Sequence, residues 1–514
     1  MIMDFAHLRQ PNKRKKADVL VLPFWKGKPG AQMAVSLKGE LPRLLADALA
    51  TEDFKGKEGE ILYLYVAGQP EKRISLLGLG SKDKATVESL RRCYGNLTKS
   101  CLSKRLKSIN LMIPQLEGLK EEDLLRGLAE GLLLPNYTFN ELKHRDPEEL
   151  EESLLQTVTW IGSQQQVLGI AEKTSAICEA VYFTRNLVNG NADAITPQYL
   201  AQCAKSLAKK HPSIKTTVFD KKRIEKEKMG LLLAVNRGSA LDPAFIIMEY
   251  RGNPHSHDHT VLVGKGVTYD TGGLNLKPTG GMETMKCDMA GAAACFGTIL
   301  ASCLLRLKVN LTVVVPSTEN CTDAKSFKPG DVYTSYSGKT VEMTNSDAEG
   351  RLILADGLSY AIKKLNPTRL IDLATLTGAI EIALGSEASG LMSTNDELAQ
   401  ALLQSGEVTF ERLWRMPLFE EYKERLKSDI ADLKSWNGRS AGANVAATFL
   451  RQFVGKSLPW AHIDIAGTAY VMEAKKYLPK YATGFGVRLM IEFLEKLENQ
   501  KGGKPAKEKR KSIL

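Results

Sequence analysis

The feature that most constrains the fold of this chain is a series of short apolar runs that alternate with helical segments. The runs read TVLVGK, LTVVVP, LIDLAT and HIDIAG, and helices are expected between them at 290–305, 352–365 and 441–454. Continuous apolar runs of this length are typical of strands that are buried on both faces. The pattern therefore predicts an α/β unit with a mostly parallel sheet.

A second, smaller α/β unit is expected in the first third of the chain. Strands are expected at 17–25, 61–66, 74–80, 108–114 and 157–162, with a helix at 86–106. A helical segment at 165–186 is interpreted as a connection between the two units. The expected organisation is a first unit at 1–164, the connecting helix at 165–186, a larger unit at 187–498 and a basic, disordered tail at 499–514.

Composition excludes several classes of protein. A hydrophobic fraction of 43% and a charged fraction of 25% are ordinary for a globular protein and exclude a chain that is disordered throughout. No run of about 18 apolar residues predicts a transmembrane helix, so no membrane partner is expected. The basic start lacks the apolar core of a signal peptide, and the eight cysteines contain no CxxC pair. Reduced thiols and a cytoplasmic location are expected.

The net charge of +11 is concentrated at the two ends of the chain. The tail Lys501–Leu514 holds six basic residues and one acid, and Lys13, Arg14, Lys15 and Lys16 lie near the start. Two interpretations stay open: solvated termini, or a surface that binds nucleic acid or another acidic partner. No aromatic residues are interleaved with the basic ones, so base stacking is not indicated.

Two glycine-rich segments, Val263–Ala294 and Ser337–Ala361, carry the residues that indicate chemistry. Both follow apolar strands, and ligand sites in open α/β sheets lie at the carboxyl ends of strands. Buried carboxylates must be paired or bind metal, and three aspartates with one glutamate suffice for two divalent ions. An internal salt-bridge network is the alternative. The polar residues in these segments are Lys265, Asp270, Lys277, Asp288, Asp347, Glu349 and Arg351.

These segments resemble the signature blocks of the leucyl aminopeptidases, the M17 family of cytosol aminopeptidases. NSDAEGRLILADGLSYA is similar to the block that carries NTDAEGR in the family, with Ser346 in place of the threonine. VGKGVTYDTGGLNLK is similar to the other block, with Asn275 where a serine is usual. The likeness runs from about Asn186 to Glu498. It implies a macro-like N-terminal α/β domain and a larger C-terminal α/β/α dimetal peptidase domain.

The resemblance also implies the ligands of two divalent metal ions, Zn²⁺ or Mn²⁺. Asp270 and Glu349 would bridge both ions, Asp347 would complete one site, and Lys265 with Asp288 would complete the other. A lysine binds metal only as the neutral amine, and two dications with burial would depress its pKa. The expected activity is hydrolysis of N-terminal residues, preferably leucine or other apolar ones, from peptides by a metal-bridged hydroxide. A free substrate amine on one metal would restrict cleavage to the first residue.

The remaining site residues follow from the same resemblance. Lys277 would stay protonated and act on the scissile carbonyl, and Arg351 would hold bicarbonate as a proton shuttle. The pocket for the first residue would be free of charge, with Ala469 at its edge. The residues expected to line it are Met285, Thr375, Gly378 and Ala466.

The resemblance implies a homohexamer, and it leaves two other functions open. Some bacterial members of the family bind DNA, which the basic surface and termini here would suit. Macro folds often bind ADP-ribose, so a nucleotide site in the first domain is a further alternative.

Three other motifs are assigned to structure. The histidines of HSHDH at 255–259 are expected in a solvated hairpin loop, and His462 is expected in the core. GRSAG at 438–442 resembles a nucleophile elbow, but no acid separates Ser440 from the only later histidine. A serine hydrolase is therefore excluded.

Overall fold

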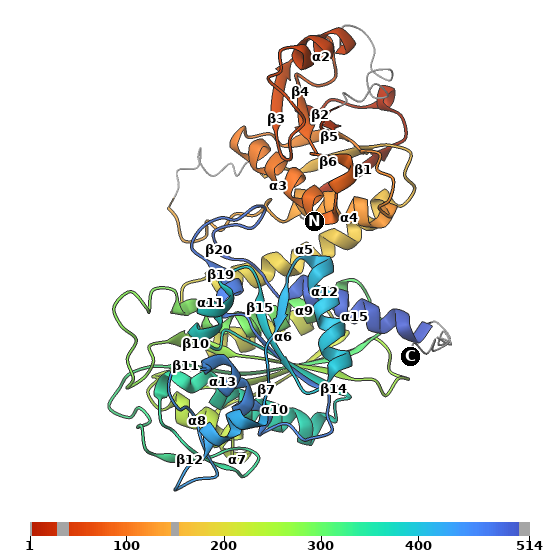
Figure 1. Ribbon diagram of the computed structural model, residues 1–514. Helices are drawn as coiled ribbons and strands as arrows, with labels where there is room; N and C mark the ends of the chain where they lie inside the picture. Colours follow the sequence, from red (N-terminus) through yellow and green to blue (C-terminus); the bar gives the residue numbers. More distant parts are fainter. Residues whose placement is uncertain (1–2, 28–40, 145–153, 503–514) are drawn as a thin grey trace, which may run out of the picture. The chain divides into compact units, whose positions relative to one another are not determined.

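The computed structural model describes residues 3–27, 41–144 and 154–502, which form two compact units (Figure 1). Unit 1 comprises Met1–Glu179 with Glu473–Lys480, and unit 2 comprises Ala180–Met472 with Tyr481–Leu514. The division falls inside the long helix α5, Val167–Asn189. The last helix, α15, runs over Val487–Gly502, so residues 499–502 of the expected disordered tail are helical. The rest of that tail lies outside the described residues.

Unit 1 is built on a six-stranded sheet in the order β1-β6-β5-β2-β4-β3, in which only β3 runs antiparallel to its neighbour. Its strands are β1 (Asp4–Leu8), β2 (Val19–Phe24), β3 (Ile61–Tyr65), β4 (Arg73–Gly78), β5 (Ser108–Met112) and β6 (Thr157–Ile161). Its helices are α2 (Leu41–Ala50), α3 (Val87–Ser103) and α4 (Glu121–Leu133). The sequence did not predict β1, α2 or α4. The β1 segment, DFAHL, is too polar to be recognised as a strand, and it is half-exposed at the sheet edge.

Buried ion pairs hold unit 1 together. Arg91 on α3 is 1% exposed and pairs with Glu130 on α4 and with Glu88 one turn before it. Tyr477, from the returning segment Glu473–Lys480, donates a hydrogen bond of 2.9 Å to Glu88. Near the start of the chain, Arg14 pairs with the buried carboxylate of Glu71 at 2.9 Å. Arg14 is therefore held within unit 1, whereas Lys13, Lys15 and Lys16 beside it are exposed.

Unit 2 contains a nine-stranded sheet in the order β16-β15-β18-β14-β9-β11-β8-β7, with β10 paired to β11 beside this path. The pairings of β9, β10, β11, β14 and β18 with one another are parallel, as are those of β15 with β16. The pairings β7–β8, β8–β11 and β15–β18 are antiparallel. The sheet strands are β7 (Ile214–Phe219), β8 (Ala244–Arg251), β9 (Thr260–Gly264), β10 (Gly266–Asp270), β11 (Asn310–Asn320), β14 (Arg369–Ala374), β15 (Ser389–Ser393), β16 (Leu413–Arg415) and β18 (Trp460–Asp464).

Two long helices cover opposite faces of the central strands. A Cβ at Gly264 would meet Ala292 of α9, whereas the neighbouring Val263 contacts Gly357 of α10. Adjacent strand residues point to opposite faces, so α9 and α10 lie on different sides of the sheet.

The helices of unit 2 are α6 (Pro197–Lys210), α7 (Lys221–Lys226), α8 (Gly230–Asn236), α9 (Ala290–Leu304), α10 (Glu349–Leu365), α11 (Gly378–Leu384), α12 (Asp396–Thr409), α13 (Gly442–Arg451), α14 (Ala466–Ala469) and α15. The short strands are β12 (Val332–Thr334), β13 (Thr340–Glu342), β17 (Leu433–Lys434), β19 (Tyr470–Val471) and β20 (Tyr481–Ala482).

Segment Met285–Leu304, which includes α9, is long and apolar enough to cross a membrane by length and composition alone. However, 89% of its most apolar window is buried inside the structure. It is therefore a core helix, which the sheet and α15 cover.

The expected hairpin at 255–259 is wrong. Strands β8 and β9 flank this loop, but β11 lies between them in the sheet. His255 and His257 are exposed, whereas His259 is 4% exposed and its ring bonds to Thr312 and to the carbonyl of Leu365. His462 is fully buried, as expected, and its Nδ1 lies 2.6 Å from Asp372.

Candidate active site and metal centre

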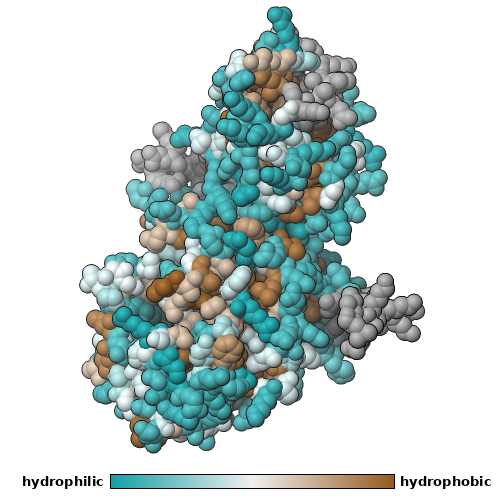
Figure 2. Space-filling model, in the orientation of Figure 1, coloured by the Kyte–Doolittle hydropathy of each residue, from teal (hydrophilic) through white to brown (hydrophobic). Residues whose placement is uncertain are grey.

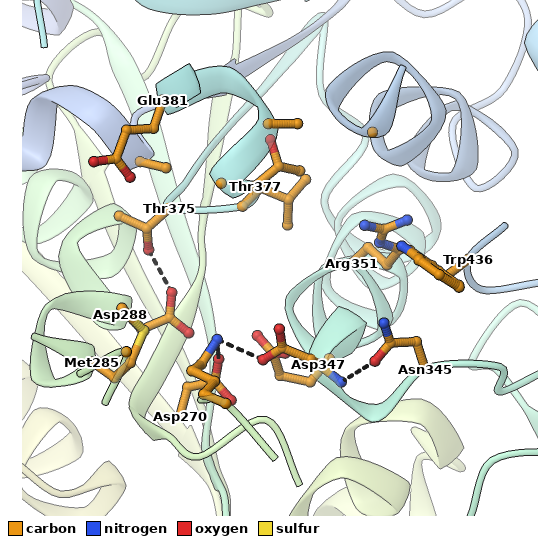
Figure 3. Close-up of a pocket in the computed structure, with 18 of the residues that line it drawn as sticks. Asp270, Met285, Asp288, Asn345, Asp347, Arg351, Thr375, Thr377, Glu381 and Trp436 are labelled. Carbon is orange, nitrogen blue, oxygen red and sulfur yellow. Dashed lines mark hydrogen bonds and ion pairs between the residues drawn. The ribbon is translucent and has the colours of Figure 1, made fainter. Parts of the chain in front are cut away.

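A cavity of about 590 Å³ opens at the carboxyl ends of the central parallel strands (Figure 3). Lys265 follows β9, Asp270 ends β10, Thr375 follows β14 and Ala466 comes shortly after β18. Asp288 lies in the short 3-10 helix η3 (Met285–Met289), and Asp347 in η4 (Ser346–Ala348). The lining residues include every one predicted as a metal ligand, catalytic residue or pocket residue: Lys265, Asp270, Lys277, Met285, Asp288, Asp347, Glu349, Arg351, Thr375, Gly378 and Ala466.

Lys265 lies buried between two carboxylates. Its Nζ is 2.7 Å from Asp288 Oδ1 and 2.9 Å from Glu349 Oε1, and it donates a third bond of 2.8 Å to the carbonyl of Thr375. Burial by itself lowers the pKa of Lys265, but the surrounding carboxylates outweigh it and raise the pKa. Gly350 makes this approach possible, because a Cβ there would lie 2.6 Å from Lys265 Cε.

Lys277 lies among the other carboxylates of the cluster. Its Nζ is 2.7 Å from Asp270 Oδ2 and 2.5 Å from Asp347 Oδ1. Although burial lowers the pKa of Lys277, the negative charges around it raise the pKa overall. The ammonium form of Lys277 is therefore favoured among these carboxylates.

Four carboxylates share this small volume, and their charges are not fully balanced. One oxygen each of Asp270, Asp347 and Glu349 lies within 4.8 Å of the others. Burial and the charge of Glu349 raise the pKa of Asp270 to about 6. Burial also raises the pKa of Glu349, but Lys265 and Lys277 outweigh it and lower the pKa. Four carboxylates this close carry more negative charge than the two lysines balance, so they cannot all ionise unless further cations bind among them.

Two buried carboxylate oxygens in the cluster, Asp288 Oδ2 and Glu349 Oε2, have no hydrogen-bond partner. A buried charged oxygen without a partner is costly, and a divalent cation removes that cost. The donor set of carboxylates with one amine also suits ions such as Mn²⁺ and Zn²⁺. The residues therefore fit a metal centre.

The two departures from the family blocks, Ser346 and Asn275, hydrogen-bond to each other. The backbone N–H of Ser346 donates to Asn275 Oδ1 at 2.8 Å, and the backbone N–H of Asn275 donates to Ser346 Oγ at 2.7 Å. Ser346 Oγ also donates to the carbonyl of Gly272. These bonds join the segment that bears Asp270 to the segment that bears Asp347.

Arg351 lies in the first turn of α10, on the opposite side of the cavity from Met285 (Figure 3). Its Nη1 donates a bond of 2.9 Å to the carbonyl of Ser435, whereas its buried Nε has no partner. Burial lowers the pKa of Arg351 to about 10, so the group remains charged at neutral pH. A buried, charged donor without a partner favours an anion at this position.

Comparison with known proteins follows the same division of the chain. The catalytic domain of the cytosol aminopeptidase family matches residues 182–491, and the N-terminal domain of that family matches residues 21–146. The chain belongs to the cytosol aminopeptidase family. It is 65% identical over 495 residues to a probable cytosol aminopeptidase of Protochlamydia amoebophila, which covers 96% of this chain and 99% of the relative. A probable cytosol aminopeptidase of Chlamydia abortus is 47% identical over 494 residues, covering 94% and 97% of the two chains.

Solved structures of the same architecture agree with this assignment. A tomato leucine aminopeptidase mutant superposes with a TM-score of 0.85 at 32% identity, covering 96% of each chain. The bottromycin maturation enzyme BotP in complex with Mn gives a TM-score of 0.82 at 31% identity, covering 94% of this chain and 100% of that one. The chain is thus a two-domain α/β aminopeptidase, and its cluster of acids is a candidate metal site.

The first-residue pocket of this family member differs from the expectation in two ways. Ala469 is buried and does not line the cavity. Glu381 of α11, a charged residue outside the expected set, also lines this cavity. No sequence motif contained this residue, which lies six residues after Thr375.

A second residue that the sequence did not reveal is Asn320, at the end of β11. Its Nδ2 donates to Asp270 Oδ1 at 2.8 Å and to the carbonyl of Ser346 at 3.0 Å. Asn320 therefore fixes the carboxylate of Asp270 and links the two motif segments. The sequence did not indicate this role because Asn320 lies outside both motif segments.

Proposed function

We propose that this chain is a dimetal aminopeptidase that removes N-terminal leucine and other apolar residues from peptides. The observation that carries the proposal is a cluster of four carboxylates and two lysines at the base of the cavity. Asp347 is its exposed member, and two buried carboxylate oxygens of Asp288 and Glu349 have no partner. Family membership supports the reaction class. Most buried polar groups in proteins are hydrogen-bonded, so two unpartnered carboxylate oxygens in one cluster favour a bound cation there.

Two divalent ions, Zn²⁺ or Mn²⁺, would be held by the five predicted ligands. Asp270 and Glu349 would contribute to both sites, Asp347 to one, and Asp288 with Lys265 to the other. In the absence of metal the carboxylates raise the pKa of Lys265, and two dications would reverse this and leave its amine neutral. When bound, such ions polarise a peptide carbonyl and lower the pKa of an attacking water. Because Gly350 has no side chain, the Lys265 side chain can pass close to the backbone of α10, which keeps its amine near Glu349.

Lys277 and Arg351 are assigned to the reacting groups. The ammonium of Lys277 would stabilise the negative charge that develops on the scissile carbonyl oxygen, which is the strongest use of a preorganised donor. The unpartnered Nε of Arg351 would hold bicarbonate at the first turn of α10, where the backbone N–H groups also favour an anion. Held there, such an anion would supply a group able to accept and return a proton.

Substrate preference tests the assignment of the pocket. Leucine and methionine anilides are expected to be hydrolysed with a much higher kcat/KM than glutamate anilide. Burying a leucine side chain gains about 1.5–3 kcal/mol, whereas an acidic side chain would meet Glu381 and the buried carboxylates. Met285 can repack, so discrimination among leucine, methionine and phenylalanine should be shallow. A preference for glutamate in this anilide panel would contradict the pocket assignment.

The proposal extends to the assembly and the location of the protein. We propose a homohexamer in the cytoplasm, on the strength of the family relationship. Sedimentation should then give a mass of about six chains, and a stable, active monomer would overturn this part of the proposal.

A further inference from the structure

Glu381 introduces a carboxylate at the edge of the first-residue pocket. It lies in the first turn of α11 and lines the same cavity as Met285, Thr375 and Ala466. Figure 3 shows Glu381 on the same side of the cavity as Thr375 and Met285, away from Arg351 and Trp436. The carboxylate therefore belongs to the side that holds the predicted pocket residues.

The backbone of Glu381 packs closely on the wall of that pocket. Helices α11 and α14 are in contact, and a Cβ added at Gly467 would lie 3.4 Å from the Cα of Glu381. Gly467 directly follows the pocket residue Ala466. This contact fixes the position from which the Glu381 side chain extends.

The charge of Glu381 is not neutralised by the protein. No ion pair in the part of the chain that the structure describes involves Glu381, and its side chain is exposed. The lysines of the cavity, Lys265 and Lys277, are held by the four cluster carboxylates. A cation that enters the pocket thus meets a free carboxylate.

Apolar residues line the cavity together with this carboxylate. Met285 and Ala466 supply the inner wall, and Ile382, next to Glu381, is 90% exposed. Figure 2 shows hydrophobic residues among hydrophilic ones in the region where Figure 1 places α11. Long cationic side chains bury an aliphatic stem along such surfaces while the charged end stays near water.

We propose that Glu381 is a specificity-determining residue that admits N-terminal arginine and lysine alongside apolar residues. The aliphatic stem packs against Met285 and Ala466, and the terminal cation pairs with the Glu381 carboxylate. This inference rests on the proposed aminopeptidase function and adds a second class of substrate to it.

A structural role is the competing explanation. An acidic residue in the first turn of a helix interacts favourably with the helix dipole, and Glu381 occupies such a position. That role would affect every substrate alike, whereas a specificity role would affect only cationic ones. A ratio of two substrates within one enzyme separates the two explanations, because changes in overall activity cancel.

The test compares kcat/KM for arginine and citrulline anilides, which have nearly the same shape and differ in charge. The wild-type enzyme should prefer arginine by about two- to fivefold, the scale of a partly exposed ion pair. Glu381→Gln should abolish this preference, mainly through KM, because the pair forms in both ground and transition states. Glu381→Lys should turn the preference toward citrulline.

Glu387→Gln is the matched control, since this exposed glutamate pairs with Arg412 and does not line the cavity. It should keep the wild-type ratio. An unchanged arginine-to-citrulline ratio in Glu381→Gln, or a wild-type enzyme without the preference, would overturn the inference. Failure of the wild-type enzyme to hydrolyse leucine anilide would instead refute the proposed function itself.

Discussion

Replacing Glu349 with alanine is expected to abolish hydrolysis of leucine anilide and to reduce the metal bound per chain. Glu349 is 1% exposed, and one of its oxygens lies within 4.8 Å of oxygens of Asp270 and Asp347. As the proposed bridging ligand, it contributes to both metal sites, so its loss weakens both. The expected fall in kcat is more than about 10³-fold, beyond the roughly 10²–10³-fold typical of losing one electrostatic donor.

Glu342→Ala is the control for this experiment. Glu342 lies on β13, hydrogen-bonds to Ser428 and does not line the cavity. It should retain the wild-type metal content and activity. A Glu349→Ala enzyme with normal metal content, measured by elemental analysis, would show that Glu349 is not a bridging ligand.

Replacing Lys277 with alanine is expected to lower kcat by about 10²–10³-fold while the metal content holds. Lys277 lies at the cavity, 2.7 Å from Asp270 Oδ2, and its role is assigned to the charge of the transition state. Removing this ammonium removes a donor and no metal ligand. The measurements are kcat, metal content and the thermal unfolding midpoint of the purified variant.

Lys277→Arg separates charge from shape in the same position. Because arginine keeps the positive charge on a different geometry, activity between that of the wild type and Lys277→Ala is expected. If Lys277→Ala instead loses its metals or unfolds, Lys277 is a structural residue and the catalytic assignment is wrong.

The sequence predicted which residues gather at the cavity because they belong to two segments of the chain. Lys265 follows β9, Asp270 ends β10 and Asp288 lies in η3. Asp347 lies in η4, and Glu349 begins α10. Parallel strands bring such segments to one edge of the sheet. The family resemblance then supplied the roles of these residues.

The residues that the sequence did not reveal act from elsewhere in the chain. Asn320 reaches Asp270 from the end of β11, and Glu381 reaches the cavity from α11. Neither residue lies in a recognisable pattern, because each is placed by strand order and helix packing. The same reason explains the wrong hairpin at 255–259, since the sequence does not encode in any local pattern that β11 lies between β8 and β9.

The fold brings together the two residues at which the motifs of this chain differ from the family blocks. Each of Ser346 and Asn275 differs from the usual family residue, and the two form reciprocal hydrogen bonds. A serine hydroxyl and an amide together join the two blocks. The two differences, 71 residues apart in the sequence, thus lie in contact in the folded chain.

The measurement that tests the central claim most directly is the metal content of the enzyme together with its activity through removal and return of metal. After exhaustive chelation, hydrolysis of leucine anilide should disappear, and Zn²⁺ or Mn²⁺ should restore it as binding approaches two ions per chain. The five proposed ligands and the unpartnered oxygens of Asp288 and Glu349 predict this result. Full activity in protein shown by elemental analysis to contain no metal would contradict it.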